Sequence, residues 1–203
     1  MGGSVRMRRV RCGAAALLFG ISIWALSSCT SLDSDVVFSP PGTTTTIIMV
    51  RHAERDEGLD PPLNEEGLIR AMALADELED DGVTAIYYPD WVRNRQTAEP
   101  LAARVNPTIR VYSQIESADT KGLANRFVDE VVSDHSGGVV LWIGNTGPFI
   151  EGVQSGNLQE IFARFGGTGA PPTRYASLYT IVLHDDMPPT VTKGTYGGAS
   201  SLD

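Results

Sequence analysis

With 203 residues, of which 42% are hydrophobic, the chain has room for one ordinary domain with a substantial core. Its net charge is −9, and without residues 1–28 the chain retains 12 basic against 25 acidic residues, a balance of −13. A surface of this charge repels nucleic acid and anionic lipid headgroups, which argues against a polyanion-binding protein. An anionic substrate would therefore need a locally positive pocket.

The first 28 residues have the pattern of a secretory signal. Arginines up to Arg11 precede the apolar run Ala14–Leu26, which is short for a membrane span, and small residues follow it. The segment Leu26-Ser27-Ser28-Cys29 resembles a bacterial lipobox, in which the cysteine becomes the lipidated first residue. We therefore expect a lipoprotein signal peptide at 1–28, a lipid on Cys29, and an extracytoplasmic, membrane-anchored protein in a bacterial cell envelope. The alternative is an uncleaved anchor helix, which also places the domain outside the cytoplasm.

Cysteine and histidine usage limits the chemistry of the mature domain. The only cysteines are Cys12 and Cys29, so the domain has no disulfide, no further thiol nucleophile and no cysteine metal site. The three histidines, His52, His135 and His184, are isolated and lack metal-binding spacing. The sequence therefore predicts no metal and no cofactor.

The first predicted strand ends in two residues suited to chemistry. Residues 29–43 are rich in Ser, Thr, Asp and Pro and predict a flexible tether. Thr45–Val50 then has the composition of a strand buried on both faces, and Arg51 and His52 follow it directly. In open α/β sheets ligands bind beside the carboxyl ends of the strands, which favours a site here. The alternative is an ordinary strand exit with a surface arginine and histidine.

A helix is predicted next, over residues 65–78, after the polar loop 55–62. Asn64 suits the N-cap position, and two glutamates suit the first turn. Apolar residues recur at helical spacing and predict the inner face: Leu68, Ala71, Ala75 and Leu78.

The second predicted strand, Ala85–Tyr88, also ends in polar residues, among them Arg93 and Arg95. Parallel strands point their carboxyl ends the same way, so two successive strand ends with arginines suggest a shared anion site. Because Pro100 limits a long helix, residues 91–104 are predicted as two turns, a kink and a second helical piece.

The remaining elements continue the alternation. Strands are predicted at 109–112 and 139–143, helices around 123–132 and over 157–165, and a final hairpin at 178–183 and 191–196. This order predicts an α/β fold, a three-layer α/β/α sandwich with a mostly parallel central sheet. The domain is expected to span 44–197, with a flexible tail at 198–203.

The collected motifs resemble the histidine phosphatase superfamily, in its small R-H-A-E branch with the phosphoglycerate mutase-like fold. R-H-x-E alone is a weak signal, but followed by R-x-x-Q-T-A after the second strand it is specific. The resemblance spans nearly the whole mature domain. It rests on Arg51-His52-Ala53-Glu54, Pro62-Leu63-Asn64-Glu65-Glu66-Gly67, Arg93-Asn94-Arg95-Gln96-Thr97-Ala98-Glu99, the strand 139–143 and Tyr196-Gly197.

This resemblance implies a phosphohydrolase acting on a small phosphomonoester. His52 would be the nucleophile that carries a phosphohistidine intermediate, and Arg51 and Arg93 would clamp the phosphoryl oxygens. Arg93 stands four residues before Thr97, as in the family pattern, so we expect Arg95 on the surface instead.

A general acid that protonates the leaving oxygen is also implied. Family members usually supply it after the third strand, where this chain has Glu116 and Asp119, and Glu116 is our choice. Glu54 is a further candidate, although its place beside His52 also suits a role in orienting the site. Glu116 and Asp119 could equally be solvated loop carboxylates.

Asn145 is the main departure from the family pattern. Similar proteins have a second histidine after the fourth strand, where this chain reads Gly144-Asn145-Thr146-Gly147-Pro148. The Asn145 amide could donate to a phosphoryl oxygen, but losing a charged donor commonly costs a rate factor on the order of a hundred or more. Three hypotheses follow: a phosphohydrolase impaired or specialised by Asn145, a pseudophosphatase that only binds a phosphorylated ligand, and a protein-interaction module.

Overall fold

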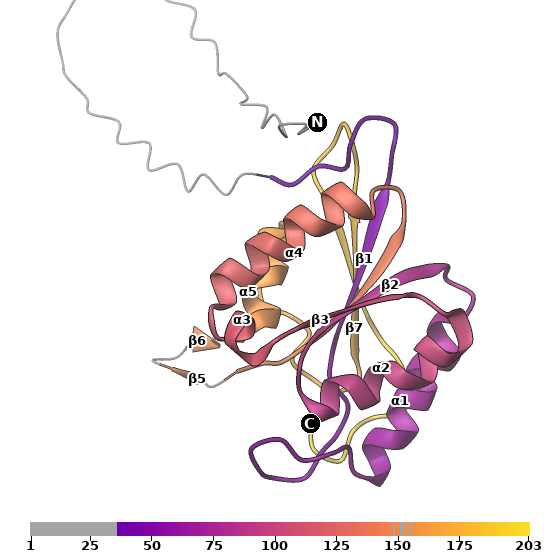
Figure 1. Ribbon diagram of the computed structural model, residues 1–203, viewed down its shortest axis with the longest axis vertical. Coiled ribbons are helices and arrows are strands. Elements are labelled where there is room, and N and C mark those ends of the chain that lie inside the picture. Colours follow the sequence, from indigo (N-terminus) through magenta and orange to yellow (C-terminus); the bar gives the residue numbers. More distant parts are fainter. Residues whose placement is uncertain (1–35, 148, 151–152, 155) are drawn as a thin grey trace, which may run out of the picture. The chain divides into compact units, whose positions relative to one another are not determined.

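Figure 1 shows the computed structural model of the chain, which describes residues 36–147, 149–150, 153–154 and 156–203. The predicted signal peptide, the lipidation site Cys29 and the first part of the tether lie outside the described residues. Val36–Asp203 forms one compact unit. Within the described part of the chain, every helix is too short or too polar to span a bilayer.

The domain begins earlier than predicted, because residues 36–43 are docked onto it. The backbone N–H of Ser39 donates to the carbonyl of His184 at 2.9 Å. The N–H of Gly42 donates to the carboxylate of Asp185 at 2.7 Å. These two acceptors lie just before the last strand, so this part of the expected tether is held by long-range backbone contacts that its composition did not indicate.

The central sheet has six strands in the order β3-β2-β4-β1-β7-β8. The four strands from β3 to β1 run parallel, whereas β7 is antiparallel to β1 and β8 to β7. A separate two-stranded sheet joins β5 and β6. This arrangement confirms the predicted α/β fold with a mostly parallel sheet. The strands are β1 (Thr45–Arg51), β2 (Val83–Pro89), β3 (Thr108–Tyr112), β4 (Val139–Gly144), β5 (Phe149–Ile150), β6 (Val153–Gln154), β7 (Ser177–Leu183) and β8 (Thr190–Thr195).

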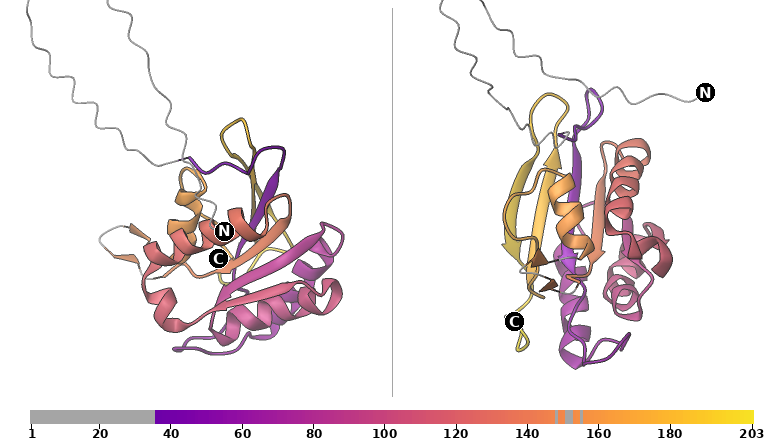
Figure 2. Two further views of the ribbon diagram at one scale, coloured as in Figure 1. Left: turned by 45° about the horizontal axis from the view of Figure 1, so that its top comes forward. Right: turned by 90° about the vertical axis from the view of Figure 1, so that its left-hand side faces the viewer.

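Helices cover both faces of the sheet. α1 and α2 pack on one face, and α4 and α5 on the other, and the two pairs are visible in Figures 1 and 2. The short helix α3 directly precedes α4 and was not predicted. The helices are α1 (Glu65–Leu78), α2 (Val92–Val105), α3 (Gln114–Ala118), α4 (Thr120–Asp134) and α5 (Asn157–Arg164).

Helix α2 runs through Pro100 without interruption, so the predicted division into two helical pieces is wrong. A proline inside a helix removes one backbone hydrogen bond and crowds the preceding turn. The residues on either side of it compensate, because Ala98 and Leu101 are buried in the cluster between this helix and the sheet. The packing of α2 on the sheet therefore outweighs the tendency of Pro100 to interrupt the helix.

The inner face of α1 also differs from the prediction at one residue. Leu68 is 52% exposed, and Gly67 and Arg70 are buried in its place. The cause is the close approach of Gly67 to the strand exit, since a Cβ atom there would lie 2.0 Å from the carbonyl oxygen of Glu54. A glycine is required where two backbones come this close.

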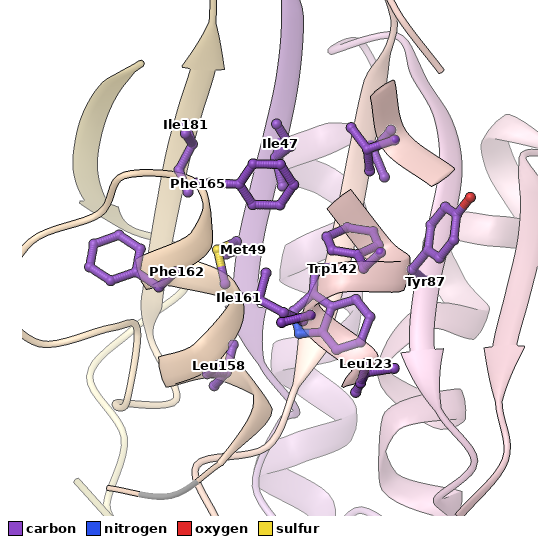
Figure 3. Packing of buried hydrophobic residues seen from close by; sticks show 14 of the residues in the cluster. Ile47, Met49, Tyr87, Leu123, Trp142, Leu158, Ile161, Phe162, Phe165 and Ile181 are labelled. Carbon is purple, nitrogen blue, oxygen red and sulfur yellow. The ribbon is translucent and has the colours of Figure 1, made fainter. Parts of the chain in front are cut away.

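The larger core cluster lies between the sheet and helices α4 and α5 (Figure 3). Trp142 of β4 is fully buried, and its ring centroid is 4.7 Å from that of Phe127 of α4. Large aromatic side chains contribute much of the apolar area that stabilises a core. The packing of Trp142 therefore fixes β4 two residues before the strand ends.

The tail 198–203, predicted to be flexible, is bound to the domain. The backbone N–H and the hydroxyl of Ser201 both donate to the carboxylate of Glu66. The carboxylate of Asp203 accepts from the backbone N–H of Tyr175 at 3.0 and 3.1 Å. The tail carries polar groups that match partners on the domain, which composition alone does not reveal.

Candidate functional site

The carboxyl ends of β1 and β4 place three predicted site residues at one rim. Arg51 pairs with Gly144 in the parallel ladder, and the backbone N–H of His52 continues it by donating to the Gly144 carbonyl at 3.0 Å. Asn145 follows Gly144 directly. The two strand exits are therefore held in fixed register.

The R-x-x-Q-T motif at the start of α2 holds the strand exit from the other side. The Thr97 hydroxyl oxygen accepts from the backbone N–H of Ala53 at 2.9 Å. The same hydroxyl donates to the carbonyl of Arg93 at 2.7 Å. Thr97 thus ties the residue after His52 to the turn that carries Arg93, a positioning role that the sequence did not reveal.

Two amides of the same motif bind neighbouring backbone groups. The side-chain oxygen of Gln96 accepts from the N–H of Leu63 at 2.8 Å, which fixes the loop before α1. The side-chain amide of Asn94 donates to the carbonyl of Ile143 at 2.9 Å, one residue before β4 ends. The motif therefore anchors three separate segments around the rim.

His52 is oriented for nucleophilic chemistry. Its Nδ1 lies 2.8 Å from the carbonyl oxygen of Ala53. Because a carbonyl only accepts, Nδ1 carries the proton, and Nε2 keeps a lone pair in the neutral ring. Burial, with the side chain 3% exposed, lowers the pKa of His52 well below 6.5, and the nearby charges of Arg51, Arg93 and Arg55 act in the same direction.

This pKa shift predicts that His52 stays neutral in mildly acidic solution. A lowered pKa means that the ring keeps its lone pair as the pH falls through 6.5 and protonates only further down. A ¹H–¹⁵N NMR titration of the imidazoles measures this directly, with His184 as the comparison. A midpoint for His52 at or above 6.5 would contradict the described environment.

Three arginines surround His52, one more than the sequence indicated. Arg51 and Arg93 are joined by Arg55, from the polar loop 55–62, and the charges of all three lower the pKa of His52. Arg55 stands four residues after Arg51, but this spacing alone did not identify it. The Nε atom of each arginine is buried and has no hydrogen-bond partner. Buried donors without acceptors are costly, so the cluster is suited to an anion.

Neighbouring groups hold the guanidinium groups of Arg51 and Arg93 in place. Arg51 donates from Nη1 to the carbonyl of Thr173 at 2.9 Å and from Nη2 to the hydroxyl of Tyr175 at 3.1 Å. Arg93 donates to a carboxylate oxygen of Asp60 at 3.2 Å, and its Cζ lies 4.7 Å from the centroid of the Trp91 ring. Burial lowers the pKa of both arginines, although the group stays charged at any relevant pH.

Glu116 and Asp119 both take part in helix capping. The Glu116 carboxylate accepts from the N–H and hydroxyl of Ser113, both at 2.8 Å, in a capping box that begins α3. These bonds lower the pKa of Glu116, which opposes a role as proton donor. Asp119 caps α4 by accepting from the N–H of Gly122 at 2.9 Å. The catalytic role of Glu116 stays a prediction that these contacts do not favour.

Glu54, the third candidate acid, has a structural partner. It is fully buried, and its Oε1 accepts from Nε of Arg70 at 2.6 Å. Arg70 also donates to the carbonyls of Tyr196 and Gly198 at 3.1 and 3.0 Å. This arrangement joins the His52 loop, α1 and the residues that follow β8. A role of Glu54 in orienting the site stays a prediction.

Asn145 lies half-buried at the rim. Its backbone N–H donates to the side-chain oxygen of Asn157 at 2.9 Å, which fixes the strand exit against the start of α5. Its own side-chain oxygen is buried without a hydrogen-bond partner. Arg95 is exposed and pairs with Glu99 at 3.7 Å, on the surface as expected from its place in the motif. Among the described residues, no cluster of His, Cys, Asp and Glu could hold a metal ion.

Known proteins resemble this chain in sequence and in fold. The model of the family described as Histidine phosphatase superfamily (branch 1) matches residues 47–148. An 8-oxo-(d)GTP phosphatase of Mycolicibacterium smegmatis is 33% identical over 100 residues, which are 44% of this chain and 31% of that protein. The match thus spans about a third of that relative.

Solved structures share the fold at low sequence identity. The protein histidine phosphatase SixA complexed with tungstate has a TM-score of 0.57 at 16% identity, covering 74% of this chain and 96% of that chain. A phosphoglycerate mutase from Bacillus anthracis has a TM-score of 0.52 at 16% identity, covering 79% of this chain and 94% of that chain. These similarities support the architecture described above.

Proposed function

The chain belongs to the histidine phosphatase superfamily (branch 1), and from this premise we propose that it is a phosphohydrolase that cleaves a small phosphomonoester. One observation carries the proposal: three arginine side chains with buried, unpartnered Nε donors act on a neutral, buried histidine. Such a cluster binds a phosphoryl group and presents a nucleophile to it.

The proposed reaction has two steps. The Nε2 lone pair of His52 attacks phosphorus, the bond between phosphorus and the leaving oxygen breaks, and that oxygen takes up a proton from solvent, to which the attacking water of the second step returns one. Water then attacks the phosphohistidine, which releases inorganic phosphate and restores the ring. Arg51, Arg55 and Arg93 offset the negative charge on the phosphoryl oxygens throughout, which is where such donors contribute most.

A simple assay tests the proposal. The purified protein is incubated with a generic aryl phosphate across acid to neutral pH, and released phosphate is measured against buffer alone. Release above the buffer rate is expected. No release above that rate would overturn the proposed phosphohydrolase activity. Calorimetric titration with inorganic phosphate would then test the alternative, a pseudophosphatase that binds a phosphorylated ligand.

Asn145 is the observation that favours this alternative, because the position lacks a chargeable donor. If the rest of the site is intact, Asn145→His is expected to raise the rate of aryl phosphate hydrolysis by a factor on the order of a hundred, by supplying a cationic donor to the transition state. The rates of Asn145→His, Asn145→Ala and the unchanged protein are compared at one pH. A histidine variant no faster than the unchanged protein would contradict the prediction.

We also propose that the protein is exported and anchored by a lipid on Cys29. The support is the lipobox-like sequence and the preceding apolar run. Radioactive palmitate labelling and membrane fractionation of expressing bacteria test this proposal, with Cys29→Ser as the control. Equal labelling of the two proteins would exclude lipidation at Cys29.

A further inference from the structure

Tyr175, which precedes β7, lies among the proposed phosphate-binding groups. The Cζ atom of Arg51 stands 3.9 Å from the centroid of its ring. The His52 ring packs against it at 5.8 Å between centroids, with the planes inclined by 67°. A phenol that is only 5% exposed thus lies beside the proposed nucleophile, His52, and beside Arg51.

The hydrogen bonds of the Tyr175 hydroxyl indicate what this group can bind. The hydroxyl oxygen accepts from Nη2 of Arg51 at 3.1 Å, so its own hydrogen stays available to a second acceptor. No bond from this hydroxyl to an acceptor is found within the described residues. A buried donor is costly to leave unpaired, and a neighbouring guanidinium polarises it further. The group is therefore a candidate donor to an anionic oxygen of a ligand.

Backbone contacts on both sides of Tyr175 fix its position. The carbonyl of Thr173 accepts from Nη1 of Arg51 at 2.9 Å, and the N–H of Tyr175 donates to the carboxylate of Asp203. The N–H of Tyr196 donates to the carbonyl of Ala176 at 2.9 Å. A donor held in this way needs no reorganisation when the ligand arrives, and such preorganisation is what makes electrostatic stabilisation effective.

We propose that Tyr175 is a further phosphoryl-binding residue whose hydroxyl donates to a phosphoryl oxygen. The Tyr175 hydroxyl supplies an uncharged hydrogen-bond donor in a site where Asn145 cannot supply a charged one. The catalytic part of this inference rests on the proposed phosphohydrolase function, whereas the binding part does not.

Tyr175→Phe tests the hydroxyl, because phenylalanine keeps the ring under Arg51 and removes only the oxygen. Loss of one preorganised donor is expected to lower kcat for an aryl phosphate by a factor on the order of ten to a hundred, with KM changed much less. The affinity for orthovanadate, measured by calorimetry, is expected to fall on the order of tenfold. Tyr179→Phe is the matched control, because Tyr179 contacts Phe162 and Lys193 instead.

The vanadate measurement separates failure of this inference from failure of the proposed function. A protein that binds vanadate but releases no phosphate lacks the proposed activity, and a weaker affinity in Tyr175→Phe would still support the hydroxyl contact. Equal vanadate affinity and equal kcat in Tyr175→Phe and Tyr179→Phe would overturn the inference, as would no vanadate binding by the unchanged protein. Matching melting temperatures show that the variants are folded.

Discussion

His52→Ala is expected to abolish aryl phosphate hydrolysis, with a rate loss on the order of 10⁴-fold or more. The remaining arginines would still bind the phosphoryl group, but the first step needs the Nε2 lone pair. The measurement is phosphate release at saturating substrate. Because His52 is buried, His52→Asn is made as well, since its side-chain amide can still donate to the Ala53 carbonyl.

His184→Ala is the matched control for this loss. His184 follows β7, which runs antiparallel to β1, so it lies near the amino-terminal end of β1, whereas His52 follows the carboxyl end of that strand. Its replacement is expected to leave the rate unchanged. Undiminished turnover in both His52 variants would show that another group is the nucleophile, and the phosphohistidine mechanism would then be abandoned.

Glu54→Gln is expected to lower the free energy of unfolding by about 3–5 kcal/mol, because it leaves the buried Arg70 charge without a counterion. Both side chains are almost inaccessible to water, so solvent cannot replace the lost partner. Urea denaturation followed by circular dichroism measures the change. Activity should fall as well, because loss of the pair with Arg70 loosens residue 54, whose backbone carbonyl accepts from the N–H of Asn64 and packs on Gly67 next to the His52 loop.

Two further variants show whether the unpaired buried charge causes the loss of stability in Glu54→Gln. Glu99→Gln breaks an exposed helix pair with Arg95 and is expected to leave the unfolding midpoint nearly unchanged. The double variant Glu54→Leu/Arg70→Met removes both charges and should be less destabilised than Glu54→Gln. Equal losses in the single and double variants would contradict the explanation by an unpaired charge.

Local sequence patterns were sufficient to predict the strands and the helix that carry the site. Thr45–Arg51 forms a buried strand because β-branched and apolar residues fill both of its faces. Helix α1 begins after Asn64 as predicted, because the Asn64 side chain accepts from the N–H of Gly67. The α/β class and the mostly parallel sheet followed from alternating elements, and the pairing of β1 with β4 brought Arg51 and Asn145 to one rim.

The partners of the polar side chains were decided only by the tertiary structure. The sequence placed Arg55 in a loop and did not mark Tyr175, which lies 124 positions from Arg51 although their side chains are hydrogen-bonded. It also did not show that Glu54 pairs with Arg70 or that Glu116 caps a helix. Periodicity reports which face of an element is buried, because burial follows local spacing. Which charge meets which partner depends on chain segments far apart in sequence, and only the folded chain brings them together.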